Sequence, residues 1–223
     1  SELEVSELKS AVRAGVLGGR FTPVFCGSSL KNIGVQPLID AVVEYLPSPK
    51  DLGEIDGFDP SSSQKKSRKL SAKEALAALC FKVFTSEHGE LCYLRVYSGK
   101  ITSGQSVYNV TKDRKERVMR LCLMHANEQE ALTEACAGDI VTAIGLKFTS
   151  TGDTLCDKSA PILLEPIVFP ETVISMAIEP KTVADKDKLA EGLDRISKED
   201  PTFKRKMDAE TGQILISGMG ELH

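Results

Sequence analysis

The middle of the chain alternates short apolar runs with turn residues. Runs rich in Val, Ile, Leu and Tyr occupy residues 78–85, 91–97, 117–124, 140–146 and 154–155, and Ser86 and Ser98 directly follow the first two. β-Branched and aromatic side chains suit a pleated, half-buried surface. Glycine permits the positive φ that a tight reversal requires. Short strands at regular spacing predict an antiparallel β-barrel or sandwich, with the core of the protein in residues 75–164.

The N-terminal residues follow a helical period. Apolar residues recur three and four positions apart in residues 3–17 and again in residues 34–46, and Gly18-Gly19 and Pro47-Ser48-Pro49 end the two patterns. Between them, residues 21–26 form a compact apolar run that predicts a buried strand, and residues 27–32 form a small polar loop. The order helix, strand, loop, helix is typical of the end of an α/β layer.

The C-terminal residues predict a different layer. Residues 173–180 read as a strand, and Thr182 or Asp185 is placed to cap a helix whose face carries Leu189, Leu193 and Ile196. Residues 203–208 and 213–217 then predict a hairpin across Glu210-Thr211-Gly212. Strand, helix, strand, strand is the beginning of a split β-α-β fold.

Several polar stretches are predicted to be irregular. Residues 51–71 lack apolar periodicity, which predicts a flexible linker, and residues 129–136 read as an acidic connecting loop. An alternative for the linker is that its basic side chains contact RNA phosphate; these are Lys65, Lys66, Arg68 and Lys69. Residues 112–117 read as a charged hairpin tip, either simply exposed or in contact with RNA. His125 is expected to be a hydrogen-bonded structural residue, and His88 has no catalytic neighbours in the sequence.

The composition excludes several classes of protein. The 223 residues carry a net charge of −4, which argues against a protein that coats nucleic acid. No apolar run approaches the ~20 residues that cross a bilayer, and the acidic start lacks a signal core, so we expect a cytoplasmic protein without a membrane partner. The six Cys show no Cys-x-x-Cys pair, so we expect reduced thiols and no metal site. The first residue is not Met, and we expect both ends to be boundaries within a longer chain.

A set of sequence blocks carries a family resemblance. In the middle of the chain these are Phe81-Lys82-Val83-Phe84, Leu94-Arg95-Val96-Tyr97-Ser98-Gly99-Lys100-Ile101, Met124-His125-Ala126-Asn127, Ala137-Gly138-Asp139-Ile140 and Thr151-Gly152-Asp153-Thr154-Leu155-Cys156. Near the end they are Ile178-Glu179-Pro180-Lys181-Thr182, Glu199-Asp200-Pro201 and Ser217-Gly218-Met219-Gly220-Glu221-Leu222-His223. In order and spacing the blocks resemble bacterial or organellar-type elongation factor G over nearly the whole chain.

The resemblance implies a multidomain α+β protein. Residues 1–50 would be the remnant of an α/β GTPase domain, residues 51–73 a linker, residues 74–166 an antiparallel β-barrel of the translation-protein type, and residues 167–223 a truncated ferredoxin-like α/β sandwich. It also implies a ribosome-dependent GTPase that drives tRNA and mRNA translocation. Such a protein uses GTP with Mg²⁺, acts as a monomer, and has ribosomal RNA and ribosomal proteins as partners.

The resemblance also assigns a candidate nucleotide contact. The loop at residues 27–32 resembles the fifth guanine-nucleotide motif of translational GTPases, which implies guanine contacts from Ser28, Ser29 and Leu30, with Ser29 in place of the common Ala. The alternative is a plain strand-to-helix loop capped by Ser28 or Ser29. The phosphate loop, the guanine-selecting Asn-Lys-x-Asp and the Asp-x-x-Gly switch motif are absent from these residues.

Two conclusions follow from those missing motifs. The 223 residues alone are not expected to bind or hydrolyse GTP, and no catalytic residue is assigned. The alternatives to a translocase are a non-catalytic ribosome- or RNA-binding module, and a segment of a ribosomal protection or release-type translational GTPase.

Overall fold

A computed structural model describes residues 4–86, 89–126, 128–180, 182–209 and 211–223. The predictions that involve His88, Asn127, Lys181 and Glu210 lie outside these residues. The chain divides into two compact units, Ser1–Gly53 and Glu54–His223. The predicted division into domains at residues 50, 73 and 166 stays a prediction.

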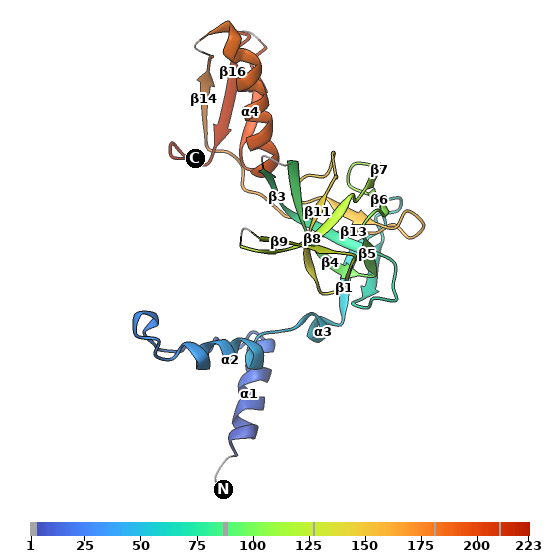
Figure 1. The fold of residues 1–223 in the computed structure, drawn as a ribbon, viewed down its shortest axis with the longest axis vertical. Coiled ribbons are helices and arrows are strands. Elements are labelled where there is room, and N and C mark those ends of the chain that lie inside the picture. Colours follow the sequence, from blue (N-terminus) through green and yellow to red (C-terminus); the bar gives the residue numbers. More distant parts are fainter. Residues whose placement is uncertain (1–3, 87–88, 127, 181, 210) are drawn as a thin grey trace. The chain divides into compact units, whose positions relative to one another are not determined.

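The first unit is built from helices, as the periodicity predicted. It contains α1 (Val5–Leu17), a 3-10 turn η1 (Ser29–Lys31), α2 (Val35–Tyr45) and a short α3 (Pro49–Leu52) (Figure 1). Polar contacts join α1 to the end of α2, because Lys9 pairs with Glu44 at 2.5 Å and Arg13 donates to the Glu44 carbonyl at 2.8 Å. Arg13 also pairs with Asp51 at 2.8 Å, and the Ser48 backbone N–H and hydroxyl reinforce this arrangement by donating to the same carboxylate. These bonds lower the pKa of Asp51, with the Ser48 backbone bond contributing most.

The predicted buried strand at residues 21–26 is wrong. This segment is not a strand, and the side chains of Phe21, Val24 and Phe25 are 50%, 91% and 43% exposed. A strand exists only where a second strand supplies hydrogen-bonding partners, and among the described residues of this unit the only bridge is Ser28 with Ile33. An apolar run without a neighbouring strand therefore stays extended and exposed.

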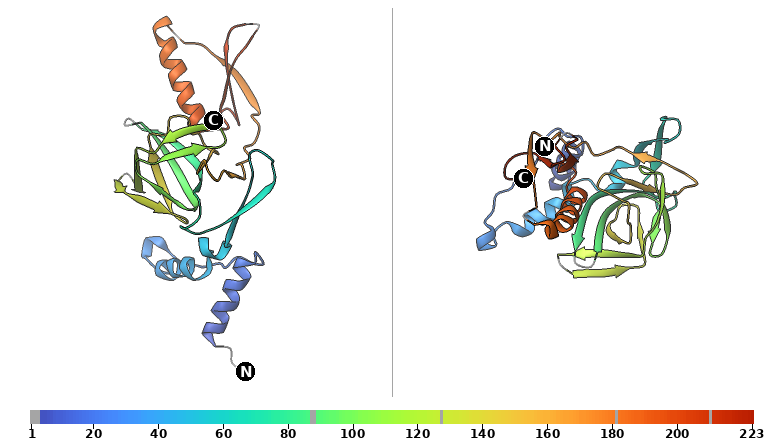
Figure 2. Two further views of the ribbon diagram at one scale, coloured as in Figure 1. Left: turned by 90° about the vertical axis from the view of Figure 1, so that its right-hand side faces the viewer. Right: turned by 90° about the horizontal axis from the view of Figure 1, so that it is seen from above.

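The second unit contains the predicted β core. Its largest sheet is antiparallel and has the order β7-β6-β12-β3-β4-β11-β8-β9 (Figures 1 and 2). The strands are β3 (Ala77–Ser86), β4 (Gly89–Ser98), β6 (Ser106–Asn109), β7 (Arg114–Arg117), β8 (Arg120–His125), β9 (Glu128–Leu132), β11 (Ile140–Ile144) and β12 (Thr154–Cys156). Beside it, β5 (Lys100–Thr102) pairs with β10 (Glu134–Cys136).

Along these strands, buried side chains alternate with more exposed ones, and the buried side chains fill the interior. Within β4, Leu94 and Val96 are fully buried, and they pack in one cluster with Ile101, Leu121 and Leu155. The core therefore lies within residues 75–164, as the sequence predicted. The acidic stretch at residues 129–136, predicted as a loop, instead supplies β9 and β10. Its polar side chains are compatible with a strand because β9 is an edge strand and most of its side chains are exposed.

The paired strands form an open series rather than a ring. β7 stands at one end of the order and β9 at the other, so the sheet is antiparallel as predicted, but the closed barrel stays a prediction.

The predicted flexible linker is wrong for most of its length. Residues 54–69 form a hairpin of β1 (Glu54–Phe58) and β2 (Lys65–Lys69), and β1 also pairs with β13 (Leu163–Leu164). The physical reason is a second apolar cluster, in which Ile55 and Leu163 pack against Ile162 and Leu164. Gly57 permits the close approach of the strands, because a Cβ there would lie 2.6 Å from the Leu163 carbonyl oxygen.

The last part of the chain follows the predicted order of strand, helix and hairpin. β14 (Ile174–Ile178) is followed by a 3-10 turn η2 (Val183–Asp185), α4 (Lys186–Glu199), β15 (Lys204–Met207) and β16 (Ile214–Gly218). The antiparallel order is β14-β16-β15. Leu193 of α4 is buried, and Arg205 of β15 donates to the Ala190 carbonyl at 3.1 Å and pairs with Asp194 at 3.0 Å. The helix therefore covers one face of this three-stranded sheet.

The cysteines lie mostly in the β core. Cys80, Cys92, Cys122 and Cys156 are buried, and Cys26 is exposed. A hydrogen bond with Cys92 and burial raise the pKa of the Cys80 thiol, which keeps it protonated and inert. Among the described residues there is no helix with the length and apolar character of a membrane span, and no group of three metal-binding side chains.

Candidate functional site

The loop with the predicted site residues is a tight, self-bonded turn. Ser28 and Ile33 exchange two backbone hydrogen bonds, of 2.9 Å from the Ser28 N–H and 3.0 Å from the Ile33 N–H. Between them Ser29–Lys31 forms η1, and Asn32 closes the turn in the left-handed region at φ 52°. Asn adopts this conformation more readily than most residues, so the sequence favours the turn locally.

Two glycines bring the backbone of this loop against itself. A Cβ on Gly27 would lie 2.7 Å from the Ile33 carbonyl oxygen, and one on Gly34 would lie 2.9 Å from the Cys26 carbonyl oxygen. Gly34 also has φ +76°, which a larger residue rarely adopts. The glycines therefore fix the distance between the segment before η1 and the start of α2.

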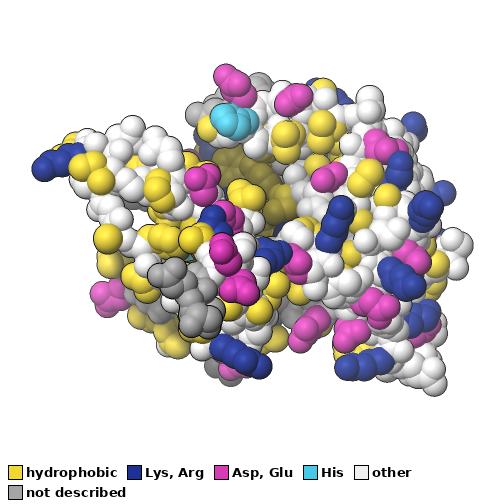
Figure 3. All heavy atoms as spheres, turned by 90° about the horizontal axis from the view of Figure 1, so that it is seen from below, with side chains coloured by type: hydrophobic (Ala, Val, Ile, Leu, Met, Phe, Trp, Pro, Cys, Tyr) yellow, Lys and Arg dark blue, Asp and Glu magenta, His cyan; other side chains and the backbone are white. Residues whose placement is uncertain are grey.

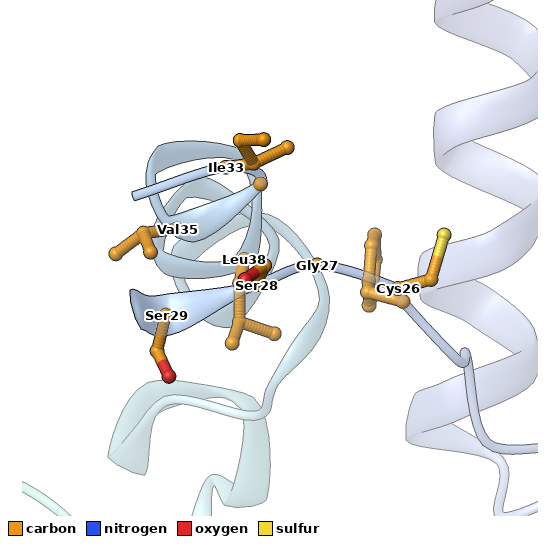
Figure 4. A pocket seen from close by; sticks show the side chains of 9 residues that line it. Cys26, Gly27, Ser28, Ser29, Ile33, Val35 and Leu38 are labelled. Atoms are coloured by element: carbon orange, nitrogen blue, oxygen red, sulfur yellow. The ribbon is translucent and has the colours of Figure 1, made fainter. Parts of the chain in front are cut away.

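A pocket of about 260 Å³ opens at this turn (Figure 4). Ser28 and Ser29 line it from one side, and Val35 and Leu38 contribute apolar surface from the first two turns of α2. The rest of the lining is Phe25, Cys26, Gly27, Ile33 and Gly34. Leu30, the third predicted residue, is 96% exposed and does not line the pocket. The structure thus brings together two of the three predicted residues.

Backbone donors are the groups that this turn leaves available. The Ser28 N–H is bonded to Ile33, but within the described residues the N–H groups of Ser29 and Leu30 have no hydrogen-bond acceptor. The first N–H groups of a helical turn have no partner within it, which explains why these two are free. Ser28 precedes η1 without a side-chain capping bond, so the alternative of a serine-capped loop is not what the structure contains.

The charged tip at residues 112–117 is partly an internal structure. The Lys112 ammonium contacts the Asp153 carboxylate at 3.1 Å and donates to the Ser150 hydroxyl at 2.6 Å. Glu116, on the same hairpin, is 6% exposed and accepts from the Thr149 hydroxyl at 2.6 Å. Lys112 is therefore unsuited to be a free RNA contact.

Sequence reasoning missed the residue that organises this tip. The Asn109 side chain is fully buried and donates to Asp153 at 3.0 Å, Thr149 at 3.3 Å and Glu116 at 3.4 Å. Its side-chain oxygen accepts from the Lys112 N–H at 3.0 Å. Asn109 is the last residue of β6, and no local signal in the sequence indicated that two buried carboxylates converge on it.

The remaining basic side chains of the tip border a second hollow. Lys115, Arg117 and Lys147 surround a depression of about 360 Å³ whose other lining residues are Glu116, Met119, Gly145 and Phe148. Arg114 lies against the Phe148 ring, 4.5 Å from its centre, which fixes the guanidinium by a cation–π contact. This face combines positive charge with an exposed aromatic ring.

The four basic residues predicted as RNA contacts in the linker divide into two pairs. Lys66 pairs with Asp59 at 2.5 Å, and Arg68 donates to backbone carbonyls of Ala75 and Leu76 at 3.3 and 2.9 Å and to that of Ala160. Lys65 and Lys69 remain exposed. His125 is exposed and has no side-chain hydrogen bond among the described residues, so the prediction of a hydrogen-bonded structural histidine is wrong.

Comparisons with known proteins match elongation factors along the chain. A family model described as "Elongation Factor G, domain III" matches residues 169–223, and one described as "Elongation factor Tu domain 2" matches residues 89–156. Elongation factor G of Dehalococcoides mccartyi is 52% identical over 223 residues, which are 100% of this chain and 32% of that protein. A crystal structure of a protein from Thermus thermophilus has a TM-score of 0.77 and 27% identity, covering 100% of this chain and 31% of that one. The chain thus spans about a third of the length of these relatives.

Proposed function

Because this chain belongs to the elongation factor G family, we propose that it is part of a ribosome-dependent GTPase that drives tRNA and mRNA translocation. The observation that carries the proposal is 52% identity to an elongation factor G along all 223 residues. In a full-length protein of this kind, GTP with Mg²⁺ is the cofactor, and ribosomal RNA and proteins are the partners. We propose that it acts as a monomer in the cytoplasm.

The first unit is proposed to be part of the nucleotide-binding domain. Its free Ser29 and Leu30 N–H groups are suited to donate to the guanine carbonyl oxygen, and small residues at Gly27 and Ser28 leave room for a flat base. Only Gly15 and Ala41 are buried among the described residues 4–53, and apolar side chains of α2 such as Val43, at 77%, are exposed. Hydrophobic side chains, in yellow, are visible on the molecular surface (Figure 3). We propose that the rest of that domain covers them in the full-length protein.

The eight-stranded sheet is proposed to act as a stiff, closed barrel. The support is that β7 and β8 are separated by two residues only, while β7 pairs with β6 and β8 pairs with β11. The Val118 N–H donates to the carbonyl of Gln105, just before β6, and the Met119 N–H to that of Ile144, the last residue of β11, so the segment between β7 and β8 contacts two strands that are separated in the series. Seen from above, the strands curve around a common centre (Figure 2). A closed body transmits displacement without bending.

Membership of the same family also suggests roles for the C-terminal layer and for the basic face of the β sheet. We propose that residues 174–218 begin a ferredoxin-like layer, since strand order β14-β16-β15 with α4 as the crossover matches a split β-α-β unit. The face bearing Lys115, Arg117, Lys147 and Phe148 is proposed to contact ribosomal RNA, since it joins positive charge to an exposed ring.

A pair of substitutions at Ser29 tests the guanine contact in the full-length protein. Ser29→Pro removes the N–H, and proline is accommodated as the first residue of a helical turn after Ser28, whose φ −135° and ψ 102° are extended. Ser29→Ala keeps the N–H and serves as the control. We expect Ser29→Pro to raise the Kd for GTP about tenfold, the effect of ~1.4 kcal/mol, and Ser29→Ala to change it less than about threefold.

The activity itself is tested by ribosome-stimulated GTP hydrolysis and by translocation of peptidyl-tRNA. A full-length protein that shows neither would refute the proposed function. Equal GTP affinity in the two Ser29 variants would refute the guanine contact alone. For the 223 residues by themselves we expect no measurable nucleotide binding, and micromolar affinity for GTP would contradict that expectation.

A further inference from the structure

One outward face of the eight-stranded sheet is incompletely covered. Within β4, Leu94 and Val96 belong to the main apolar cluster, so Arg95 and Tyr97 lie on the opposite face. Tyr97 packs against the second apolar cluster, to which β1 and β13 contribute. Ile140 of β11, which pairs with Arg95, is 48% exposed. The cover that β1 and β13 supply therefore does not extend over Ile140.

Backbone pairing arranges the side chains of this face in two rows. Residues directly opposite each other in antiparallel strands have their side chains on the same face. One row is Lys82, Tyr93 and Thr142, and the other is Leu79, Arg95 and Ile140. None of these six residues is acidic, although the chain carries 32 acidic and 28 basic residues. We refer to the six residues as the Arg95 face.

The two cations of the Arg95 face have no carboxylate partner. Within the part of the chain that the structure describes, neither Lys82 nor Arg95 forms an ion pair. Each lies instead near an aromatic ring of β4, with the Arg95 guanidinium 5.6 Å from the centre of Tyr97 and the Lys82 ammonium 5.7 Å from that of Tyr93. Lys82 is exposed to water, whereas Arg95 is partly buried.

Two hydrogen-bond donors of the Arg95 face are buried and unpaired. The Arg95 Nε and the Thr142 hydroxyl have no hydrogen-bond partner, and the whole Thr142 residue is 1% exposed. Thr142 lies opposite Tyr93, two positions along β11 from the partner of Arg95, so the two donors are diagonal neighbours. Native proteins leave few buried polar groups unpaired, because each costs stability. The pair indicates that a hydrogen-bond acceptor is missing from this face.

The surroundings of Arg95 favour a protein carboxylate as that acceptor. A guanidinium binds a carboxylate or a phosphate through paired hydrogen bonds. RNA phosphates are bound by clusters of Lys and Arg, but the Arg95 face holds one of each among apolar and aromatic side chains. Arg and Tyr beside an exposed Ile, without acidic residues, is the composition typical of the core of a protein–protein interface.

The same full-length protein is the expected source of this carboxylate. The chain corresponds to 32% of the length of a relative that is 52% identical to it, so most of a protein of that kind lies outside these 223 residues. We propose that an Asp or Glu set among apolar side chains, from that remainder, docks on the Arg95 face and pairs with the Arg95 guanidinium. The proposal rests on the proposed function only in assuming a full-length protein of this length, and it requires neither GTP nor the ribosome.

Thiol reactivity at position 140 tests whether the face is covered. Ile140→Cys is made in the 223-residue chain and in the full-length protein, with Cys26 and Cys136 changed to Ser because the other four cysteines are buried. Leu123→Cys is the control, since Leu123 has a similar exposure of 43%. We expect the thiol at 140 to react about tenfold more slowly in the full-length protein, where modification needs a local opening, and the thiol at 123 to react equally in both.

Three results of that measurement would overturn the proposal. Equal rates at position 140 in the two chains would show that the face is free or is covered by a separate molecule. Slow reaction in both chains would place the cover within the 223 residues. A rate that falls with protein concentration in the 223-residue chain would show that a second copy is the occupant.

Substitutions of the two cations test the pairing. In the full-length protein with Ile140→Cys, Arg95→Glu places like charges together, and Arg95→Gln removes the charge while keeping a side-chain donor. We expect Arg95→Glu to restore the fast reaction of the 223-residue chain and Arg95→Gln to restore it in part. Lys82→Glu is the control and should leave the slow rate within about twofold, because Lys82 is exposed and screened by water. A slow rate that survives Arg95→Glu would refute the carboxylate contact.

Thermal unfolding of the 223-residue chain tests whether Arg95 lacks an acceptor. Arg95→Met should raise the Tm by about 2–4 °C, because it removes an unpaired, partly buried charge and keeps most of the side-chain volume. Lys82→Met is the matched control, since Lys82 also lies near a Tyr ring but is exposed, and it should change the Tm by about 1 °C or less. A Tm lowered by Arg95→Met would show that the Tyr97 contact satisfies the cation and would contradict the proposal.

Discussion

Arg68 is expected to be the side chain that fastens the β1–β2 hairpin to the core. Its guanidinium donates to the carbonyls of Ala75, Leu76 and Ala160. Two of these carbonyls have another donor, since Ala75 also accepts from the Ser98 hydroxyl at 2.7 Å and Leu76 from the Asp157 N–H at 3.3 Å. Only the Ala160 carbonyl loses its sole described partner when Arg68 is removed.

The magnitude follows from that count. A hydrogen bond to a charged group is worth about 1.5–3 kcal/mol, and the two carbonyls that keep a partner lose less than this. We therefore expect Arg68→Ala to lower the free energy of unfolding of Glu54–His223 by about 2 kcal/mol. For a unit of this size the corresponding decrease in Tm is about 4–8 °C. Arg68→Lys should retain less than half of the contribution, because one ammonium cannot reproduce a planar fork of donors.

Lys69→Ala is the matched control for Arg68→Ala. Lys69 lies next to Arg68 on the same strand, is exposed and has no described side-chain contact, so removing it changes the charge equally. We expect its effect on unfolding to stay within ~0.5 kcal/mol. Calorimetry or urea unfolding of the three variants measures the difference. Equal losses in Arg68→Ala and Lys69→Ala would refute this account of the hairpin.

Three further predictions test packing, the buried polar network and pH dependence. Gly145→Ala should lower the free energy of unfolding by about 2–4 kcal/mol, because φ is +103° and a Cβ would collide with the Met119 side chain. Gly192→Ala in α4 is the comparison: its Cβ would meet nothing within 4 Å, and it should raise the free energy of unfolding by about 1 kcal/mol. Comparable urea midpoints for the two variants would contradict this prediction. Asn109→Ala should lower the free energy of unfolding by about 2–4 kcal/mol, because Glu116 and Asp153 lose the hydrogen bonds from its amide. Thr149→Val should lower it by about 1 kcal/mol, because Glu116 loses one hydroxyl donor. An Asn109→Ala variant as stable as the parent would contradict this prediction and would show that water replaces the amide. The bond from Lys66 lowers the pKa of Asp59 to about 2 from its ordinary 3.8, so its contribution to hairpin stability is complete above pH 3.8 and is lost as the pH falls toward 2. The NMR shift of the Ser61 amide, which donates to Asp59, should follow this titration, and a midpoint near 3.8 would exclude the pairing.

The sequence predicted those elements whose pattern is set locally. β4 alternates buried and partly buried residues, and α2 carries its apolar residues at helical spacing, so both were identified. Residues 65–69 read Lys-Lys-Ser-Arg-Lys, and nothing in that composition predicts a strand. They form one because β1 supplies partners and because the Arg68 side chain turns inward to carbonyls that lie up to 92 positions away. Pairing over such separations cannot be read from a local window.

The candidate site shows the same limit. The loop could be located from its residues, but the availability of the Ser29 and Leu30 N–H groups depends on the bridge between Ser28 and Ile33 and on two glycines at close approach. The sequence also treated Lys112 and Lys115 alike. Only the folded hairpin separates a lysine turned toward buried Asp153 from one that borders an open hollow.

Few residues of the first unit are buried, and this has a practical consequence for experiments on the chain. A polypeptide that exposes Phe21, Val24, Leu38 and Val43 together should adhere to surfaces and to other copies, and should be cut early by proteases. A shortened polypeptide beginning at Glu54 would lose none of the residues that form the main apolar cluster. Crystallisation and spectroscopy of the eight-stranded sheet and of α4 with its three-stranded sheet are best begun from that shorter chain.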